Sequence, residues 1–288
     1  MSIQDFFTLL IAGISQGCTY GLIALGFVLV YKATEIVNFS HGEFMMLGAF
    51  FALMFSAYVG FWTGIILAVC VLGLLGYLLD SVIMRRIGGE NPALIFIITV
   101  AFGFIFRSAA GMIWGWEPLA FPGYFNGTSQ FGPIIVQHSR LAIIVLSIIL
   151  FILLFVFFSY NRLGIAMQAI SQNQLAAYYM SIPVKQTTSL VWVLGAAIAA
   201  IAGIFNAPFT QVDTHIGFIG IKALAGAIIG GFGSIPGAII GCLIIGILEP
   251  FSDLFLPAVK GISGYLAMFI ILMIRPDGLI RQTFVKKV

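Results

Sequence analysis

Four polar side chains lie close together between two long apolar runs: Asn38, Ser40, His41 and Glu43. These residue types occur in metal sites and in serine hydrolases. A zinc-binding helix presents two histidines four residues apart, whereas this stretch has only His41. Ser40 and His41 are adjacent, which directs their side chains apart, and no nucleophile-elbow motif surrounds the serine. The spacing therefore predicts neither a metal site nor a catalytic site.

The same cluster has two other interpretations. In the structural one, the side chains cap a half-helix and satisfy its exposed backbone groups. In the functional one, they line or gate a path across a membrane. Both interpretations place the cluster at a helix end, and the sequence leaves them open.

A second polar break has a different composition. Residues 230–237 read GGFGSIPG, and four glycines with one proline in eight residues interrupt a helix. Gly233, Ser234 and Pro236 are candidates for the substrate path, because the N-terminus of a half-helix presents backbone amides to anionic groups. The alternative is tight glycine packing without a ligand.

Residues 160–186 form the longest stretch whose polar side chains do not suit lipid. Apolar residues recur three and four positions apart with amides between them, which predicts a short amphipathic helix. Pro183 then ends it. Arg162 and Lys185 flank the helix, which favours a cytoplasmic location. The helix either docks on another protein or lies flat on the bilayer.

Arg107 is the one charged residue well inside a clear apolar run. Such a charge marks a function or requires a partner. Because Trp114 lies about two helical turns away, we expect Arg107 to reach the interface or to form an ion pair, for example with Glu117 or with another subunit. Asp213, His215 and Lys222 are expected on the outer side.

The composition indicates the class of protein. Of 288 residues, 61% are hydrophobic and 8% are charged, and the mean hydropathy is +1.14. Soluble domains have about 25% charged residues, so the sequence predicts an integral membrane protein. Apolar runs longer than the roughly 20 residues that span hydrocarbon favour helices over a β-barrel. The net charge of +3 is too small to predict nucleic-acid binding.

Uncharged runs predict about eight transmembrane helices. They cover residues 6–31, 44–58, 63–79, 93–115, 141–160 and 187–207, a broken span at 223–251, and a last span before Arg275. The run from 44 to 79 is divided near Gly60, because 36 helical residues reach about 54 Å, too long for one crossing. Residues 80–92 are placed in the cytoplasm and residues 116–139 outside.

The charges near the C-terminus require a broken or re-entrant helix at 223–251. Arg275, Arg281, Lys286 and Lys287 belong in the cytoplasm under the positive-inside rule. Two half-helices that enter and leave on the outer side put them there, whereas one inward crossing does not. Irregular backbone at membrane depth has to be covered by protein or to line a water-filled cavity, which points to a substrate path. The side of the N-terminus stays open, because residues 32–43 fit a loop or a re-entrant stretch.

Four stretches resemble one transporter family. They are IVNFSHGEFMMLGAF (36–50), RLGIAMQAISQNQLAAYYMSIPV (162–184), GIKALAGAIIGGFGSIPGAIIG (220–241) and RPDGL (275–279). Their order and spacing are similar to those of the permease subunits of branched-chain amino acid ABC importers, the LivH-like group. The resemblance implies an all-α polytopic membrane protein with the ABC importer permease fold, one permease domain over residues 1–288, and a location in the bacterial cytoplasmic (inner) membrane.

The resemblance also implies partners. They are a second related permease, two cytoplasmic ATPase subunits that bind ATP and Mg, and a periplasmic or extracellular amino-acid-binding protein, besides membrane lipid. Residues 161–186 then form a coupling segment that docks on an ATPase subunit. The implied contact residues are Gly164, Met167, Gln168, Ala169, Ser171, Gln172, Asn173, Ala176, Ala177 and Ser181. Family members often have arginine where this chain has Gln168, and glycine where it has Ser181. Without the arginine, electrostatic steering of the ATPase subunit toward the segment is weaker.

Other functions stay in consideration. A permease of the same build for urea, amides or other small solutes fits the same motifs. A stand-alone channel or secondary transporter would place ion-coupling carboxylates in mid-span, whereas Glu43, Glu249 and Asp253 are all expected near span ends. The chain lacks a G-x-x-x-x-G-K-[ST] loop, so we expect ATP to bind to partner subunits. We predict no catalytic residue, metal site or cofactor in this chain.

Overall fold

The structure is a computed structural model that describes residues 3–87, 90–122, 127–131 and 134–280. The prediction for Arg281, Lys286 and Lys287 falls outside these residues. In chain order, the elements are α1 (Ile3–Thr34), α2 (His41–Val59), α3 (Phe61–Leu78), the π-helix η1 (Leu79–Met84), α4 (Arg85–Ile87), α5 (Pro92–Trp114), β1 (Thr128–Phe131), β2 (Ile134–Gln137), α6 (His138–Tyr160), α7 (Arg162–Gln172), α8 (Gln174–Tyr179), α9 (Val184–Thr210), the 3-10 helix η2 (Ile216–Phe218), α10 (Ile219–Gly230), α11 (Ile235–Phe255), the 3-10 helix η3 (Pro257–Val259) and α12 (Ser263–Ile274).

Seven helices among the described residues are long and apolar enough to cross a membrane. They are α1, α2, α3 with its continuation through α4, α5, α6, α9 and α11. Two shorter apolar helices, α10 with η2 and α12, complete the set. The predicted class, an all-α polytopic membrane protein of about eight spans with a broken helix, is confirmed.

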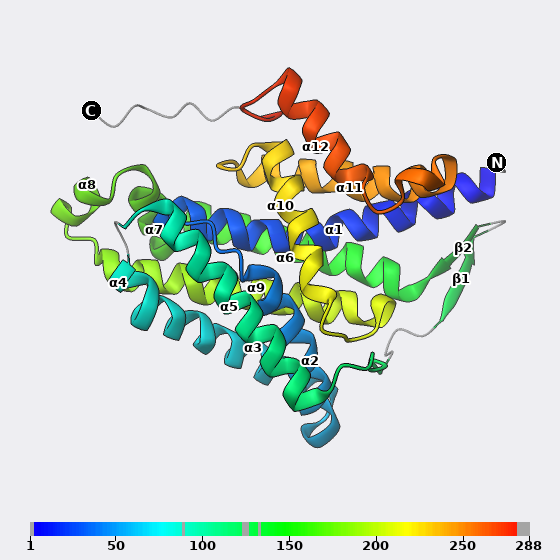
Figure 1. Cartoon of the computed structure of the whole chain (residues 1–288), viewed down its shortest axis with the longest axis horizontal. Coiled ribbons are helices and arrows are strands. Elements are labelled where there is room, and N and C mark those ends of the chain that lie inside the picture. Colours follow the sequence, from blue (N-terminus) through cyan, green and yellow to red (C-terminus); the bar gives the residue numbers. More distant parts are fainter. Residues whose placement is uncertain (1–2, 88–89, 123–126, 132–133, 281–288) are drawn as a thin grey trace.

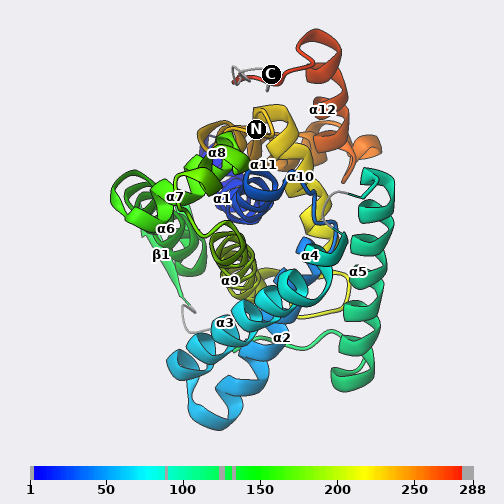
Figure 2. The ribbon, with the colours of Figure 1, turned by 90° about the vertical axis from the view of Figure 1, so that its left-hand side faces the viewer.

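Helix α1 lies at the centre of the molecule, surrounded by α6, α9, α10 and α11 (Figure 2). Every residue from 17 to 30 is buried. The peripheral helices are much less buried. In the 18-residue apolar stretch of each helix, 17% is buried in α5 and 22% in α6, compared with 89% in α1. The exposed faces of α5 and α6 are therefore available to lipid or to another subunit.

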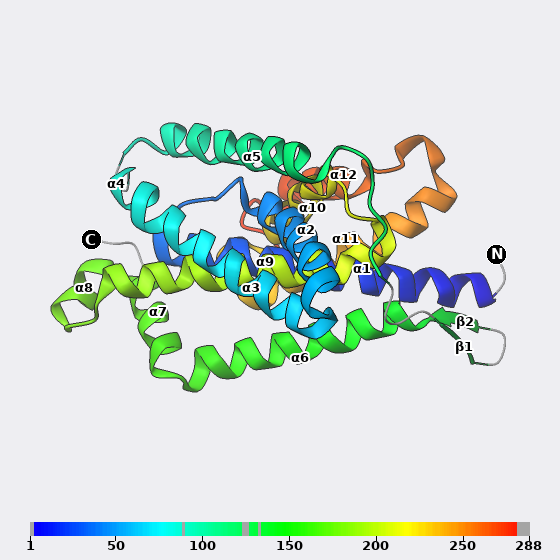
Figure 3. The same ribbon diagram turned by 90° about the horizontal axis from the view of Figure 1, so that it is seen from below.

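The two ends of the molecule carry different elements. The start of α1 and the β1–β2 hairpin lie at one end of the long axis, and α4, α7 and α8 lie at the other (Figures 1 and 3). The strands pair antiparallel, with Thr128 opposite Gln137, in a segment expected to be an irregular loop. If α7 and α8 face the cytoplasm, the start of α1 faces outward.

Helix α1 crosses the whole molecule before the chain turns back into it. Residues 36–40 are mostly buried, and α2 begins at His41, whose ring packs 4.7 Å from that of Phe27, about two helical turns before the end of α1. Both alternatives for residues 32–43 are thus partly right. The first span is complete, and the stretch after it re-enters the molecule.

The turn predicted at Gly60 is confirmed, because α2 ends at Val59 and α3 begins at Phe61. Gly60 has a φ of 87°, a conformation in which glycine avoids the strain of a Cβ atom. The span predicted to end at residue 79 continues through η1 to Ile87, which corrects the sequence interpretation. The helix continues because Asp80, 2% exposed, has partners inside the protein.

The GGFGSIPG stretch interrupts the chain as predicted. Helix α10 ends at Gly230 and α11 begins at Ile235, and the two form a hairpin whose arms pack across each other (Figures 1 and 2). The close approach requires glycine, because a Cβ atom on Gly230 would overlap the backbone carbonyl of Gly237. A Cβ atom on Gly241 would likewise overlap the carbonyl oxygen of Gly226.

Candidate functional site

The polar turn before α2 is held by its own side chains. The Asn38 Oδ1 atom accepts hydrogen bonds from the Ser40 amide at 3.1 Å and from Ser40 Oγ at 2.6 Å. The His41 amide donates to the Asn38 carbonyl at 3.1 Å. Asn38 and Ser40 are each 1% exposed. The capping interpretation describes this turn, with Asn38 rather than Ser40 as the acceptor.

The first turn of α2 packs directly on the start of α10. A Cβ atom on Gly42 would overlap the carbonyl oxygen of Gly217, and it would lie 3.3 Å from the Cα atom of Gly220. His41, at the preceding position of the same turn, is fully buried and lies against Gly26 of α1. This contact brings Glu43 to the N-terminal end of a half-helix.

Glu43 forms an ion pair with Arg107 of α5. The side chains are 8% and 15% exposed, so the pair is largely removed from solvent. The Arg107 guanidinium also stacks 3.9 Å from the ring centre of Phe218. The expected pairing with Glu117 is therefore wrong, and the expectation that Glu43 lies near a span end is misleading, because α2 itself begins deep in the molecule.

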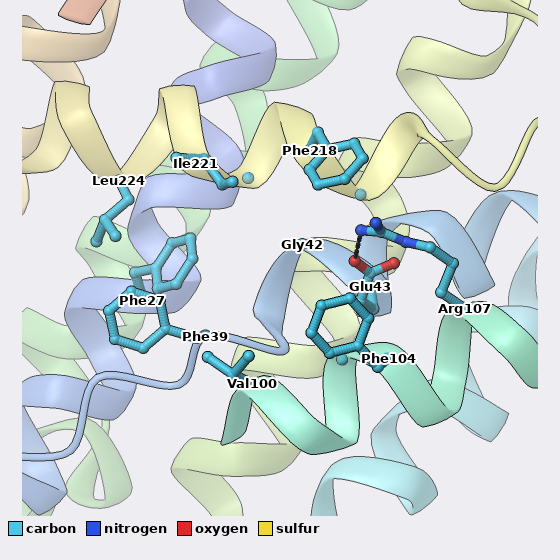
Figure 4. A pocket seen from close by; sticks show the side chains of 13 residues that line it. Phe27, Phe39, Gly42, Glu43, Val100, Phe104, Arg107, Phe218, Ile221 and Leu224 are labelled. Atoms are coloured by element: carbon cyan, nitrogen blue, oxygen red, sulfur yellow. Dashed lines mark hydrogen bonds and ion pairs between the residues drawn. The ribbon is translucent and has the colours of Figure 1, made fainter. Parts of the chain in front are cut away.

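A cavity of about 180 Å³ adjoins this pair, between α1, α2, α5 and α10. Glu43 and Arg107 lie at one end of it, and apolar side chains occupy the other end (Figure 4). They are Phe27, Phe39, Val100, Ile221 and Leu224. A site with charges at one end and aliphatic and aromatic groups at the other suits an amphipathic small molecule.

A second buried ion pair lies on the opposite side of α10. Lys222 pairs with Glu249 of α11, whose Oε2 atom also accepts hydrogen bonds from Tyr20 at 2.7 Å and from Gln16 at 2.6 Å. Glu249 is 3% exposed. Lys222 is thus an interhelical contact and does not lie in an external loop as expected. The other two residues expected on that side, Asp213 and His215, shape the turn before η2. The Asp213 Oδ1 atom accepts a hydrogen bond from the His215 amide at 2.7 Å.

The predicted path residues of the second break lie elsewhere. Gly233, Ser234 and Pro236 follow the C-terminal end of α10, whereas Glu43 lies at its N-terminal end, about 18 Å away along twelve helical residues. Ser234 Oγ accepts from the Gly237 amide at 3.2 Å and so caps α11. The structure does not bring the two predicted groups together, and it favours tight packing for the second.

The RPDGL motif and the residue after it supply hydrogen-bond donors to the last carbonyls of the broken helix. The amides of Leu279 and Ile280 donate to the carbonyls of Ile229 and Gly230, at 2.8 and 3.1 Å. These are the last carbonyls of α10, which have no partner within their own helix. Both motifs are recognisable in the sequence, but their contact is not.

The mid-chain segment is two short helices rather than one. Asn173 separates α7 from α8, and its side chain accepts from the Ala176 amide at 3.0 Å, which starts the second helix. Asparagine favours this position because its side chain replaces the missing helical partner. Ser181 follows with a φ of 62°. This left-handed conformation favours glycine.

The ten implied contact residues divide into two groups. Gly164, Met167 and Ala177 are buried within this chain, so they hold the segment in place and offer no surface to a partner. The others are exposed or half-exposed: Gln168, Ala169, Ser171, Gln172, Asn173, Ala176 and Ser181. Their contact with an ATPase remains a prediction. Gln168 and Gln174 also fix the segment, through hydrogen bonds to the carbonyls of Phe158 and Ala33.

The largest exposed side chains of this segment were not among the residues predicted from the sequence. Leu175, Tyr178, Tyr179 and Met180 are 67–80% exposed at the far end of the molecule. Two adjacent tyrosines beside a methionine in a polar segment are the signal that could have identified them. We call these four residues the α8 apolar surface.

A polar network joins this region to the core. Arg85 donates to the carbonyl of Lys185 at 2.9 Å and pairs with Asp80 at 3.2 Å. Asp80 also accepts from Ser189 at 2.5 Å. The beginning of α9, directly after the mid-chain segment, is therefore attached to the end of α3.

Comparisons with known proteins agree with this geometry. Residues 9–274 match the family model described as "Branched-chain amino acid transport system / permease component". The chain is 30% identical to the high-affinity branched-chain amino acid transport system permease protein LivH of Escherichia coli, over 96% of each chain. It is 29% identical to the corresponding protein BraD of Pseudomonas aeruginosa, over 99% of each.

A solved structure supports the fold independently. A chain in the structure of PsaBC from Streptococcus pneumoniae in complex with Fab superposes with a TM-score of 0.52 and 16% identity, over 95% of both chains. At this identity the likeness concerns the fold alone. The family match over most of the sequence, the seven apolar helices and the interrupted α10–α11 hairpin lead to one conclusion: this chain belongs to the family of permease components of branched-chain amino acid transport systems.

Proposed function

We propose that this chain is the membrane-spanning subunit of an ATP-driven importer for branched-chain or related hydrophobic amino acids in a bacterial cytoplasmic membrane. It acts as a transport subunit without catalysis of its own, beside a second related permease. ATP and Mg bind to two cytoplasmic ATPase subunits, and an external binding protein delivers the substrate. The names of the relatives support the substrate class.

The observation that best supports ATP-driven transport is the α8 apolar surface. Tyr179 and Met180 are 80% and 78% exposed at the end opposite the β1–β2 hairpin, beside exposed amides of α7. A helix lying in the bilayer surface would turn its apolar face toward the spans. These side chains instead project at the tip of the molecule, as a contact for a soluble partner requires.

The arrangement also provides a route for motion. Ile235, which begins α11, shares a small cavity of about 50 Å³ with Met167 and Gln168 of α7. A displacement of α7 by an ATPase subunit would therefore press on the tip of the α10–α11 hairpin. The other end of α10 adjoins the cavity beside Glu43 and Arg107, so α7 lies near one end of this short helix and the cavity lies at the other.

Cysteine crosslinking tests the docking. In a chain in which the exposed Cys70 is replaced by serine, cysteines are placed at Gln172 and Ala176, which are exposed, and the complex is assembled with its ATPase subunits. We expect both to crosslink to an ATPase subunit. Ala177→Cys is the matched control, because Ala177 is 3% exposed and should not react. Labelling of Gln172→Cys by an impermeant reagent from the external side of intact cells would refute the assignment.

A further inference from the structure

We infer that the cavity between α2, α5 and α10 is a binding site for the transported amino acid. The Arg107–Glu43 pair binds its carboxylate and ammonium groups, and the apolar end holds its aliphatic side chain. This inference rests on the proposed function and goes beyond it, since it names the residues that contact the substrate within the membrane.

The charged end of the cavity has unused bonding capacity. Arg107 Nε and Glu43 Oε2 are buried and have no hydrogen-bond partner among the described residues. A guanidinium has five donors and binds a carboxylate through two parallel bonds, and a carboxylate has about four acceptor positions. The zwitterion of an α-amino acid supplies the two complementary groups on neighbouring atoms. The carboxylate of the zwitterion can lie beside Arg107 and its ammonium group beside Glu43, so that positive and negative groups alternate.

The geometry orients the pair toward one class of ligand. Phe218 stacks on the guanidinium from the α10 side, which fixes the plane of Arg107. Gly103 and Gly217 border the cavity. A Cβ atom on Gly217 would overlap the carboxylate of Glu43, so glycine is required there for α10 to approach the pair.

The opposite end matches an aliphatic side chain in chemistry and in size. Figure 4 shows Phe27, Val100 and Leu224 across the cavity from the charges. The cavity of about 180 Å³ exceeds the roughly 150 Å³ that accommodates benzene in an apolar protein interior. One small molecule with a branched aliphatic group therefore fits.

The site distinguishes an amino acid from the neutral solutes considered above. Urea or an amide offers no ionic group to either member of the pair, and a site built for hydrogen bonds to a substrate group rejects analogues that lack it. A purely structural ion pair makes a different prediction. Its replacement by two neutral amides would be tolerated, because exchanging a whole buried pair for neutral residues costs little stability.

The test uses the complete complex reconstituted in lipid, with and without the binding protein. Equilibrium binding of tritiated leucine is measured without the binding protein, in competition with leucinamide, which lacks the carboxylate, and isocaproate, which lacks the ammonium group. ATP-dependent uptake of leucine is measured with the binding protein. The variants are Glu43→Gln, Arg107→Gln and the neutral double variant. The control is the double variant Lys222→Met with Glu249→Gln, which neutralises the ion pair outside the cavity.

We expect the two single variants and the neutral double variant to weaken leucine binding and to slow uptake by at least about tenfold, the loss of one charge-assisted hydrogen bond. The neutral double variant leaves no unpaired charge, so it should fold and assemble with the other subunits. The control should bind leucine as the wild type does. Both analogues should compete at least about tenfold more weakly than leucine.

Two results would overturn the inference. One is a neutral double variant that takes up leucine at the wild-type rate, whether or not binding is detected without the binding protein. The other is competition by leucinamide or isocaproate as strong as that by leucine itself. A wild-type complex without ATP-dependent uptake would instead refute the proposed function, so the two failures are distinguishable.

Discussion

The interruption before α2 is made of polar side chains, whereas the one between α10 and α11 is made of glycine and backbone. In the first, Asn38 binds Ser40, and Glu43 follows with its ion pair. In the second, the C-terminal motif donates to the carbonyls of Ile229 and Gly230. Both arrangements avoid the same energetic cost, which is that of backbone groups without hydrogen-bond partners at membrane depth.

The first break therefore places ionisable groups beside the cavity, whereas the second only allows two helices to pack closely. A break satisfied by backbone groups needs only a close approach, and glycine provides it. A break satisfied by side chains also leaves ionisable groups at its edge, where they adjoin the cavity. We therefore expect changes at the first break to affect transport, and changes at the second to affect folding. Three substitutions test this comparison, from the largest expected effect to the smallest.

Gly230→Leu should have the largest effect. Any side chain at this position overlaps the Gly237 carbonyl, which belongs to backbone and cannot move aside. We expect a loss of more than about 4 kcal/mol in the free energy of unfolding, or no folded protein. Yield and thermal denaturation in detergent measure it. Gly73→Ala is the control, because its Cβ atom meets a Val193 methyl group at 3.3 Å, and a side chain can shift. A stable Gly230→Leu protein would contradict the close approach.

Asn38→Ala should have an intermediate effect and act on both properties. It leaves the buried Ser40 amide without its acceptor, which costs about 1–3 kcal/mol. Because this turn positions Glu43, uptake per folded molecule should also fall. Asn38→Asp is the control, because it retains the Oδ1 acceptor. Comparison of the two variants separates the effect of the lost hydrogen bond from that of the lost side chain. Unchanged uptake in the alanine variant would mean that the first break is only structural.

Ser234→Ala should have the smallest effect. It removes the N-cap of α11, at a cost of about 1 kcal/mol. Uptake per folded molecule should stay at the wild-type value, because the loss of one hydroxyl leaves the contact of Ile235 with α7 in place and Ser234 lies at the far end of α10 from the cavity. Thermal denaturation and uptake are measured on the same preparation. Reduced uptake at unchanged stability would place the hairpin tip in the transport path and remove the distinction between the two breaks.

Much of the fold could be predicted because its signals are local. The helix break at 231–234 follows from four glycines and a proline within eight residues, and the turn at Gly60 from the length limit on one span. The extension of α3 to Ile87 could not be predicted, because the partner of Asp80 in α9 is 109 residues away. For the same reason, the β1–β2 hairpin and the RPDGL contact were not foreseen.

The candidate site was only half predictable. Glu43 and Arg107 were each singled out, one as part of a polar cluster and one as an intramembrane charge. Their pairing was missed, because 64 residues separate them in the sequence. In the mid-chain segment, periodicity identified an amphipathic element. It did not reveal that Met167 and Ala177 face inward while Tyr179 faces outward.

The sequence by itself determined that this is a polytopic membrane protein of the permease family, where its helices break, and which residues have unusual polarity for their surroundings. Those properties are sums over local residues, because hydrophobicity, glycine and proline act on the neighbouring backbone wherever the chain goes. Only the tertiary structure decided which charges meet. A buried charge needs a partner, but several acids were available to Arg107, and the packing of α2 against α5 selected Glu43.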